Sequence, residues 1–232
     1  MTYTGPRHRF TFPAVTRARS VILIAPVLLA CAASAQQPAP PAAPPPPPAA
    51  PVPTMSLSGQ NIAVMPITMV VADPALASDS LYAPWRDHRT ALSTADSLIG
   101  DAFAGRAPEV KWVLPPELRK VARRSPGIVG DPDLMGQAVL RSHKLHDIPD
   151  PLRSSLRNLM AVVGGRTVMV PAVIGFGRQA DGRIRADLTL VIADVRNGRV
   201  LWRSVPNGTG ATPREALDSA LTVALPVDVG GP

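Results

Sequence analysis

The chain has 232 residues, enough for one or two domains, and a formal net charge of +7. Four of the 24 basic residues and none of the 17 acidic ones lie before residue 36, so the rest of the chain carries only +3. That balance gives little support to nucleic-acid binding. Cys31 is the only cysteine, which excludes an intramolecular disulfide.

The first 35 residues have the pattern of a secretory signal. Residues 1–20 carry four arginines and no acid, residues 21–30 read VILIAPVLLA, and the small residues CAASA follow. The apolar run is too short for a membrane-spanning helix, which needs about 20 residues. We therefore expect residues 1–35 to direct export from a bacterial cytoplasm and to be absent from the mature protein.

Cys31 closes this leader in the tetrad LLAC at residues 28–31. The tetrad resembles the lipobox of bacterial lipoproteins, in which the cysteine becomes the lipid-bearing first residue of the mature chain. Lipid attachment at Cys31 would hold the protein in a membrane, and Ala32 resembles outer-membrane rather than inner-membrane sorting. The alternative is ordinary cleavage after Ala35, which would give a soluble periplasmic protein.

Residues 36–54 read QQPAPPAAPPPPPAAPVPT, a composition that cannot form a core. We expect a disordered or polyproline II spacer through residue 57. At about 3.1 Å per residue, the proline-rich stretch reaches up to roughly 60 Å and would lift the following domain off a membrane. A ligand for a proline-recognition module is the alternative, and it fits an exported bacterial protein poorly.

Residues 58–227 are expected to form a single α/β domain, followed by a tail at 228–232. Its first half alternates strands and helices. Pro66 favours a sheet edge or a bulge within the first strand, because proline lacks the N–H that a ladder needs. The expected elements are a strand at 62–71, a helix at 88–105, a strand at 109–114, a basic helix from 115, and helix starts at Asp131-Pro132 and Asp150-Pro151, the last helix ending at Gly164-Gly165.

The second half predicts a three-stranded antiparallel meander. Strands at 168–176, 184–192 and 200–202 are joined by Asp-Gly and Asn-Gly turns, which supply the positive φ angles of tight hairpins. A capping box at 212–215 then starts a final helix. We predict an α+β fold, with a mixed, mainly antiparallel sheet of about five strands covered by helices.

Three features occur together: an IAVMPI strand behind a lipoprotein-type leader, the late hairpin ADVRNGRVLWRS, and a closing helix. Asp194, Asn197, Gly198 and Trp202 carry the hairpin pattern. With these features the chain resembles a broad group of bacterial envelope lipoproteins. The group includes the penicillin-binding-protein activator lipoproteins, the curli-secretion pore lipoprotein and the amino-terminal domain of the Tol system's periplasmic protein.

This resemblance covers about residues 60–226. It implies a shared fold and a role as an assembly or regulatory partner in the envelope rather than as an enzyme. The long, proline-punctuated segment 115–150 departs from the group. The resemblance therefore implies no specific partner and no binding residues.

His143, His146 and Asp150 form the one cluster whose residue types resemble a metal site. Two histidines three apart can share a helix face, but a zinc site needs at least a third protein ligand, and the prolines nearby force an extended turn. We expect a solvated loop here and no metal. An exported metal-dependent hydrolase built on these three residues is kept as an alternative. A small-molecule-binding module is another, and it would require a sizeable apolar cleft.

Two further segments have ordinary structural explanations. Asp87 and His88 could pair as a base and its orienting carboxylate, but the chain has no nucleophile motif to serve them, and Asp87 fits the start of a helix. Residues 208–212 (GTGAT) precede a helix, where N–H groups can bind anions, but their spacing matches no phosphate-binding motif. We expect helix capping there, and no cofactor.

Arg119, Lys120, Arg123 and Arg124 form a basic stripe on the predicted helix from residue 115. Such a stripe could face an acidic envelope partner, a lipid head group or an anionic polymer, or be a solvated helix face. No aromatic residues interleave with it, which argues against nucleic acid. We predict a non-catalytic exported envelope protein that presents its domain to a protein partner, with this stripe as the first candidate contact.

Overall fold

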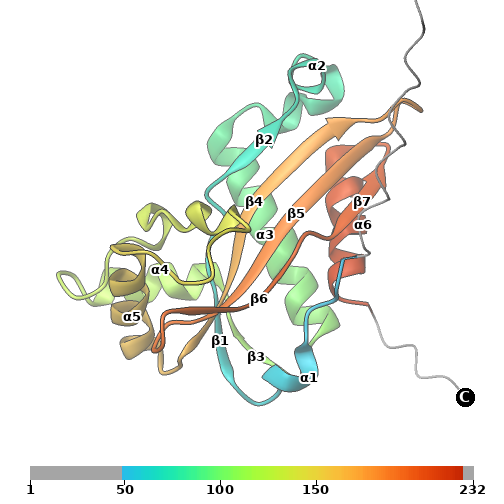
Figure 1. The fold of residues 1–232 in the computed structure, drawn as a ribbon. Coiled ribbons are helices and arrows are strands. Elements are labelled where there is room, and N and C mark those ends of the chain that lie inside the picture. Colours follow the sequence, from blue (N-terminus) through green and yellow to red (C-terminus); the bar gives the residue numbers. More distant parts are fainter. Residues whose placement is uncertain (1–48, 227–232) are drawn as a thin grey trace, which may run out of the picture. The chain divides into compact units, whose positions relative to one another are not determined.

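The computed structural model describes residues 49–226, which form a mixed sheet with helices on both faces (Figure 1). The predicted signal, Cys31, residues 36–48 of the spacer and the tail at 228–232 lie outside the described residues. Among the described helices, none is both long and apolar enough to cross a membrane.

One sheet has the strand order β3-β1-β4-β5-β6, with β2 also paired to β4 and β7 also paired to β5. Pairing is parallel between β1 and β3, β1 and β4, and β2 and β4, and antiparallel along the long β4–β5–β6 meander. The predicted mixed, mainly antiparallel sheet and its meander are thus confirmed. The strands are β1 Asn61–Val64, β2 Val70–Ala72, β3 Lys111–Val113, β4 Thr167–Arg178, β5 Ile184–Asp194, β6 Arg199–Ser204 and β7 Asn207–Gly210.

The sheet has more strands than expected because prolines interrupt two long ones. The strand predicted at 62–71 breaks at Pro66, so that β1 and β2 lie one after the other along β4. Polar side chains satisfy the backbone at this break: Gln137 Nε2 donates to Pro66 O at 2.9 Å, and Asp96 Oδ1 accepts from Ile67 N at 2.8 Å. β6 and β7 likewise follow each other along β5, separated at Pro206.

The predicted helix starts agree with the structure at most positions. Asp87 accepts a hydrogen bond from Thr90 N at 2.8 Å and caps α3, and Thr212 caps α6. The cap expected at Asp150 is wrong, since the helix begins after Pro151 and Asp150 accepts from the Ser154 hydroxyl instead. The helices are α1 Thr54–Leu57, α2 Pro74–Ala77, α3 His88–Arg106, α4 Pro115–Arg124, α5 Leu152–Val163 and α6 Pro213–Ala224, with 3-10 turns η1 Ser80–Trp85, η2 Pro132–Leu134 and η3 Gln137–Arg141.

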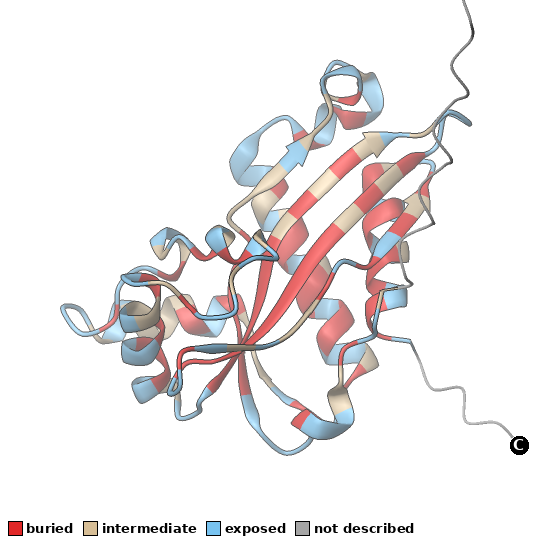
Figure 2. Cartoon of the chain, viewed as in Figure 1, coloured by how far each residue is buried: buried red, intermediate tan, exposed pale blue. Residues whose placement is uncertain are grey.

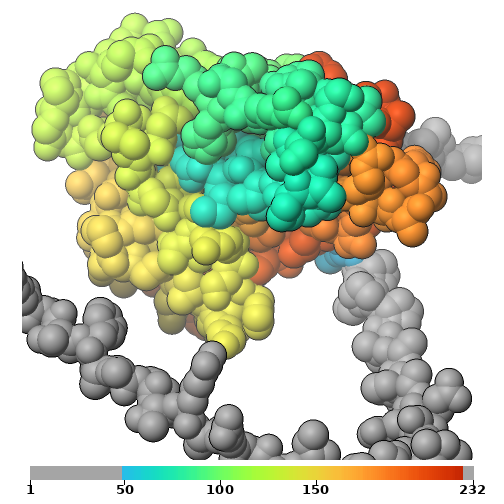
Figure 3. All heavy atoms as spheres, turned by 90° about the horizontal axis from the view of Figure 1, so that it is seen from above, coloured from blue at the N-terminus to red at the C-terminus, as the bar shows by residue number. Residues whose placement is uncertain are grey.

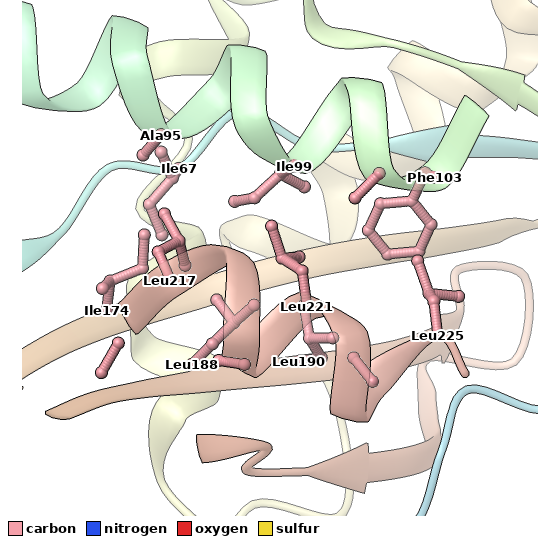
Figure 4. Close-up of a cluster of buried hydrophobic side chains, with 14 of the residues drawn as sticks. Ile67, Ala95, Ile99, Phe103, Ile174, Leu188, Leu190, Leu217, Leu221 and Leu225 are labelled. Atoms are coloured by element: carbon pink, nitrogen blue, oxygen red, sulfur yellow. The ribbon is translucent and has the colours of Figure 1, made fainter. Parts of the chain in front are cut away.

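α3 and α6 cover one face of the sheet and bury the larger core (Figure 4). Phe103 on α3 lies beside Leu225, Leu221 on α6 lies near Leu190 on β5, and each of these side chains is at most 2% exposed. Full burial of side chains of this size contributes roughly 1.5–3 kcal/mol each. The apolar positions of β5 that face this core recur at every second residue, which is the alternation expected of a half-buried strand.

α4, α5 and η3 cover part of the opposite face and bury a second core. Leu118 from α4 and Leu156 from α5 pack there against Val168 and Val191 of the central strands. The cover ends partway along β5, where Arg185 and Asp187 form an ion pair on the same face and remain partly exposed. Figure 2 shows the resulting pattern, with continuous burial at one end of the long strands and alternating burial at the other.

A third group of residues closes the end of the sheet near the β4–β5 turn. Trp85 and Tyr82 on η1 meet Phe176 edge-to-face, with ring centroids 5.0 and 6.0 Å apart. Seen from above, the segment that carries α2 and η1 lies directly beside this turn (Figure 3). Asp73, the cap of α2, also accepts a hydrogen bond from Arg178 N at 2.8 Å, so backbone and aromatic contacts fix the same corner.

The expected spacer extends too far into the domain. Val52 N donates to Ala224 O at 2.8 Å, and Val52 and Leu57 are both buried in the larger core. Residues 54–57 form α1 rather than the last part of a disordered segment. The apolar residues at the end of the proline-rich stretch thus belong to the folded body, and the chain enters it beside the last turn of α6.

Candidate functional site

Arg119, the first residue of the predicted basic stripe, is the centre of a charged network between α3, α4 and η2. Its Nη2 donates to Asp96 Oδ2 at 2.6 Å and to Asp133 Oδ1 at 2.7 Å, and its Nε donates to Asp133 Oδ2 at 2.8 Å. Asp96 is only 8% exposed and also accepts from Ile67 N. The network therefore joins two helices to the break in the first strand.

Burial and the neighbouring charges shift the pKa values of all three side chains in this network. Burial raises the pKa of Asp96, while the hydrogen bonds from Ile67 N and Arg119 oppose that rise. The Arg119 guanidinium lowers the pKa of Asp133, and both carboxylates raise the pKa of Arg119. Arg119 is thus bound to carboxylates along two of its nitrogens and is 31% exposed, so it cannot reach freely toward a partner.

The rest of the stripe divides into two kinds of side chain. Lys120 Nζ lies 3.7 Å from Glu117 Oε2 on the same helix, and this surface pair contributes little to stability. Arg123 and Arg124 are exposed at the end of α4. The stripe is therefore less positive than its sequence indicates, and its contact role stays a prediction.

Three hollows meet at Arg119. They have volumes of about 250, 380 and 480 Å³, and all three are lined by Arg119 together with residues of α3 or of the loop that carries Asp133. His88 lines the largest of them, so Asp87 and His88 have separate surroundings: Asp87 caps the helix while the histidine faces a hollow. The small-molecule alternative requires a sizeable apolar cleft, and ionised side chains form part of the wall of each hollow.

His143, His146 and Asp150 are exposed and lie in a segment that covers the edge of β6. Val200 N donates to His146 O at 2.9 Å, and Ile148 N donates to Gly198 O at 2.7 Å. In residues 49–226, no group of three His, Cys, Asp or Glu is placed to hold a metal ion. The segment supplies backbone partners to β6, which would otherwise be an open sheet edge.

Arg203 on β6 reinforces this cover from its side chain. Its guanidinium donates to His143 O at 3.2 Å and to Leu145 O at 2.8 Å. Burial lowers the pKa of the Arg203 guanidinium from its ordinary value. The histidine-containing segment is thus held to the sheet through its carbonyls.

Gly208 and Gly210 allow close packing of β7 against α6. A Cβ on Gly208 would lie 2.2 Å from Ala220 N, and one on Gly210 would lie 2.6 Å from Ala216 N. β7 therefore presses directly on the backbone of α6. The capping interaction predicted here is present, with Thr212 Oγ1 accepting from Glu215 N at 3.2 Å.

A hollow of about 580 Å³ lies between α5 and the turn from β5 to β6, and three arginines line it. We call it the basic pocket. Arg157 projects from α5, Arg166 precedes β4, and Arg196 lies in the β5–β6 turn. Sequence reasoning missed this group because its members lie far apart along the chain. The full lining is Ser154, Arg157, Asn158, Met160, Ala161, Gly165, Arg166, Val195 and Arg196.

Asp194 holds one side of the basic pocket in place. Its side chain is 1% exposed, and its oxygens accept from Arg166 Nη2 at 2.6 Å, Arg196 N at 2.9 Å and Asn197 Nδ2 at 2.9 Å. Burial opposes the charged form of this carboxyl, yet the hydrogen bonds from Asn197, Arg166 and Arg196 lower its pKa overall. Asp194 thus neutralises Arg166 and leaves the other two arginines of the pocket uncompensated.

No family model and no curated protein matches the chain. Among solved structures, the PelC dodecamer from Paraburkholderia phytofirmans is similar at 13% identity and a TM-score of 0.33, covering 72% of this chain and 88% of that one. The LpoB C-terminal domain from Salmonella enterica is similar at 15% identity and a TM-score of 0.34, covering 66% and 83%. Lipoprotein GNA1162 from Neisseria meningitidis is similar at 15% and 0.29, covering 64% and 78%.

These likenesses are a weak resemblance at the level of the fold, as the sequence indicated. At such TM-scores they carry no conclusion about a site, an assembly or an activity. The candidate surfaces are therefore judged by their own charge, burial and hydrogen bonds.

Proposed function

We propose that the chain is an exported bacterial envelope lipoprotein, held by a lipid on Cys31, whose α+β domain binds a protein partner without catalysing a reaction. The observation that supports this most is the order of segments before the domain. An uncharged apolar run ends in LLAC, and a proline-rich stretch follows. Each buried methylene of an acyl chain contributes about 0.8 kcal/mol, so two or more chains would hold the protein on a membrane.

The domain fits this arrangement because its first residues are held near its last ones. The chain enters at Val52, hydrogen-bonded to Ala224 at the end of α6. A tether would therefore act on the corner of the domain where Val52 meets the end of α6. The helices α4 and α5 and the basic pocket take no part in that corner. Partner contact on these helices is the proposal, and Arg123 and Arg124 are the exposed part of the original stripe.

Lipid labelling tests the anchor. Cells expressing the full chain or Cys31→Ser are grown with radiolabelled palmitate and then fractionated. We expect label and membrane association for the wild type, and neither for Cys31→Ser. Ser34→Ala, which changes the same small-residue zone without touching the cysteine, should label normally. A mature protein that begins at Gln36 and carries no label would contradict the proposal; separating inner from outer membranes tests the sorting that Ala32 indicates.

Crosslinking in intact cells tests the partner. We expect the anchored wild-type chain to give a discrete crosslinked species that mass spectrometry identifies as one envelope protein. The same species should form with His143→Ala/His146→Ala, because their side chains are exposed and the segment is held by its carbonyls. Absence of any discrete species, together with a hydrolytic activity that these two substitutions abolish, would favour the enzyme alternative.

A further inference from the structure

We propose that the basic pocket binds an acidic segment of the protein partner, with carboxylates of that segment meeting Arg157 and Arg196. The inference deepens the proposed function and rests on it, since it assigns a chemistry to the partner. It moves the main contact from the α4 stripe to the surface formed by α5 and the β5–β6 turn.

Close backbone packing defines one side of the basic pocket. α5 ends at Gly164, which has φ +81°, and a Cβ on Gly165 would lie 2.8 Å from both Asn61 O and Met160 Cε. The chain therefore turns sharply against β1 before β4 begins. A binding surface whose backbone is held in this way loses little entropy when a ligand binds.

The opposite wall, the β5–β6 turn, is held by Arg153 of α5 and by Asp194 at the end of β5. Arg153 lies across Gly198, where a Cβ would come within 2.5 Å of its Nε, and its Nη2 donates to Arg196 O at 3.4 Å. Asp194 binds the N–H groups of the turn and the side chain of Arg166. These contacts connect the β5–β6 turn to α5 and to the residue before β4.

The charge of the basic pocket is not balanced from within. Its lining contains no carboxylate, and the neighbouring Asp194 is buried and neutralised by Arg166. Among the described residues, no hydrogen bond or ion pair engages the side chains of Arg157 and Arg196. In contrast, Arg119 in the α4 stripe binds two carboxylates. Two guanidinium groups that line the basic pocket, those of Arg157 and Arg196, therefore remain available to a ligand.

The lining favours a carboxylate carried by a peptide. Guanidinium groups match the planar, two-oxygen geometry of carboxylates and form charge-assisted pairs with them. Met160, Ala161 and Val195 add an apolar wall that suits the methylenes of Glu side chains. The hollow is open to solvent, and its volume of about 580 Å³ leaves room for side chains of a peptide segment.

Binding is tested with a fluorescein-labelled hexaglutamate peptide and the purified full chain carrying Cys31→Ser. The test variant is Arg157→Glu/Arg196→Glu, and the matched control is Arg123→Glu/Arg124→Glu, which makes the same change of charge on α4. We expect the pocket variant to lose at least about tenfold in affinity and the control about twofold or less, with binding weakened by added salt. Arg157→Gln/Arg196→Gln should lose affinity in the same direction with less disturbance of charge, and thermal unfolding checks that each variant is folded.

Several outcomes would overturn the assignment. Equal losses in the pocket and control variants would mean that net charge alone attracts the peptide. Stronger pocket-dependent binding to phosphatidylglycerol vesicles than to the peptide would make the pocket a lipid site, and pocket-dependent displacement by millimolar inorganic phosphate would make it a phosphate site.

A cellular arm separates this inference from the proposed function. Arg157→Glu/Arg196→Glu in the lipid-anchored chain should abolish the partner crosslink while palmitate labelling continues. If labelling and crosslinking both continue, the proposed function stands and the pocket assignment falls. If the wild-type chain shows neither, the proposed function falls, whatever the peptide measurement gives.

Discussion

At the scale of single residues, Gly208 shows how a missing side chain is used. Ala216 and Ala220 form the face of α6 that meets β7, and Gly208 lies directly against their backbone. Gly208 is not among the glycines with positive φ, so close approach rather than backbone angle requires it. The helix face and the strand are thus matched in size, with alanine on one side and glycine on the other.

Gly208→Ala should be strongly destabilising. The added Cβ would meet backbone atoms at 2.2–2.6 Å, which cannot move without separating β7 from α6. We expect a loss of about 3 kcal/mol or more in the free energy of unfolding, measured by urea denaturation. The control is Gly105→Ala in α3, where nothing lies within 4 Å and the gain in helix propensity should stabilise by about 0.5–1 kcal/mol. Equal effects of the two changes would contradict the packing seen between β7 and α6.

Asp194 gives a prediction about pH. Its hydrogen bonds lower its folded-state pKa below the ordinary value of 3.8, so the carboxylate stabilises the fold above that pH, and the contribution is lost as pH falls through the folded pKa. We expect Asp194→Asn to lower the free energy of unfolding by about 2 kcal/mol at pH 7. Asn carries no charge, and its amide has one oxygen in place of the two that accept these hydrogen bonds. The difference in unfolding free energy between wild type and variant should narrow as the pH falls below the ordinary pKa of 3.8 in urea titrations.

The control for this pH effect is Asp218→Asn. The Asp218 side chain is 60% exposed, and its Oδ1 lies 3.4 Å from Arg106 Nη2. A surface pair of this kind contributes little to stability. Its substitution should change the unfolding free energy by less than about 0.5 kcal/mol, both at pH 7 and at acid pH. A gap for Asp194→Asn that stays constant with pH would show that shape rather than charge matters at this position.

At the scale of elements, the polar network of Asp96, Arg119 and Asp133 replaces a stretch of sheet. The β1 ladder ends before Pro66, and Ile67 N–H donates to the Asp96 carboxylate rather than to a strand. Because that carboxylate is buried, its charge must be balanced by a cation, and Arg119 supplies it. The position of α4 against α3 follows from this requirement. A residue that looked like part of a surface stripe is thus a structural link between two helices and a broken strand.

Arg119→Ala should leave the buried Asp96 without its counter-charge. We expect a loss of about 2–3 kcal/mol in unfolding free energy at pH 7, less than the roughly 3–5 kcal/mol of a fully buried pair, because Arg119 is itself partly exposed. Arg123→Ala on the same helix should cost less than about 0.5 kcal/mol. Adding Asp96→Asn to Arg119→Ala should recover part of the loss by removing the buried charge; a further loss instead would show that Arg119 acts through packing alone.

At the scale of the whole molecule, the proposed arrangement places a stiff tether before a domain whose entry point is fixed beside α6. The reach of the tether, rather than its sequence, should then decide whether the domain meets a partner away from the membrane. The described domain itself starts near Val52, so shortening can be confined to residues before it.

Deletion of residues 37–48 should leave palmitate labelling and thermal stability unchanged and reduce the partner crosslink. The deleted stretch shortens the reach by up to roughly 35 Å at about 3.1 Å per residue. Replacing it by twelve residues of Gly and Ser is the control for length, and we expect a partial recovery, since a flexible chain of equal length has a shorter mean extension. An undiminished crosslink after the deletion would mean that the partner lies at the membrane surface.

Much of the fold was predictable because it depends on neighbours in sequence. The Asn-Gly turn at 197–198, the cap at Thr212 and the alternation along β5 act within a few residues, and each lies where it was expected. Strand β7 was missed, because its NGTG residues have weak strand preference and are held only by pairing with β5 and packing on α6.

Sequence alone determined the helices and strands with clear periodicity and the class of the fold, and it is the whole basis of the predicted leader at 1–35. Tertiary structure alone decided which charges remain available: it paired Arg119 with Asp96 and Asp133, and it brought Arg157 and Arg196 together without a carboxylate. The physical reason is the separation along the chain over which each effect acts. Backbone preferences act over a few residues, whereas the neutralisation of a charge depends on which distant segments the cores hold side by side.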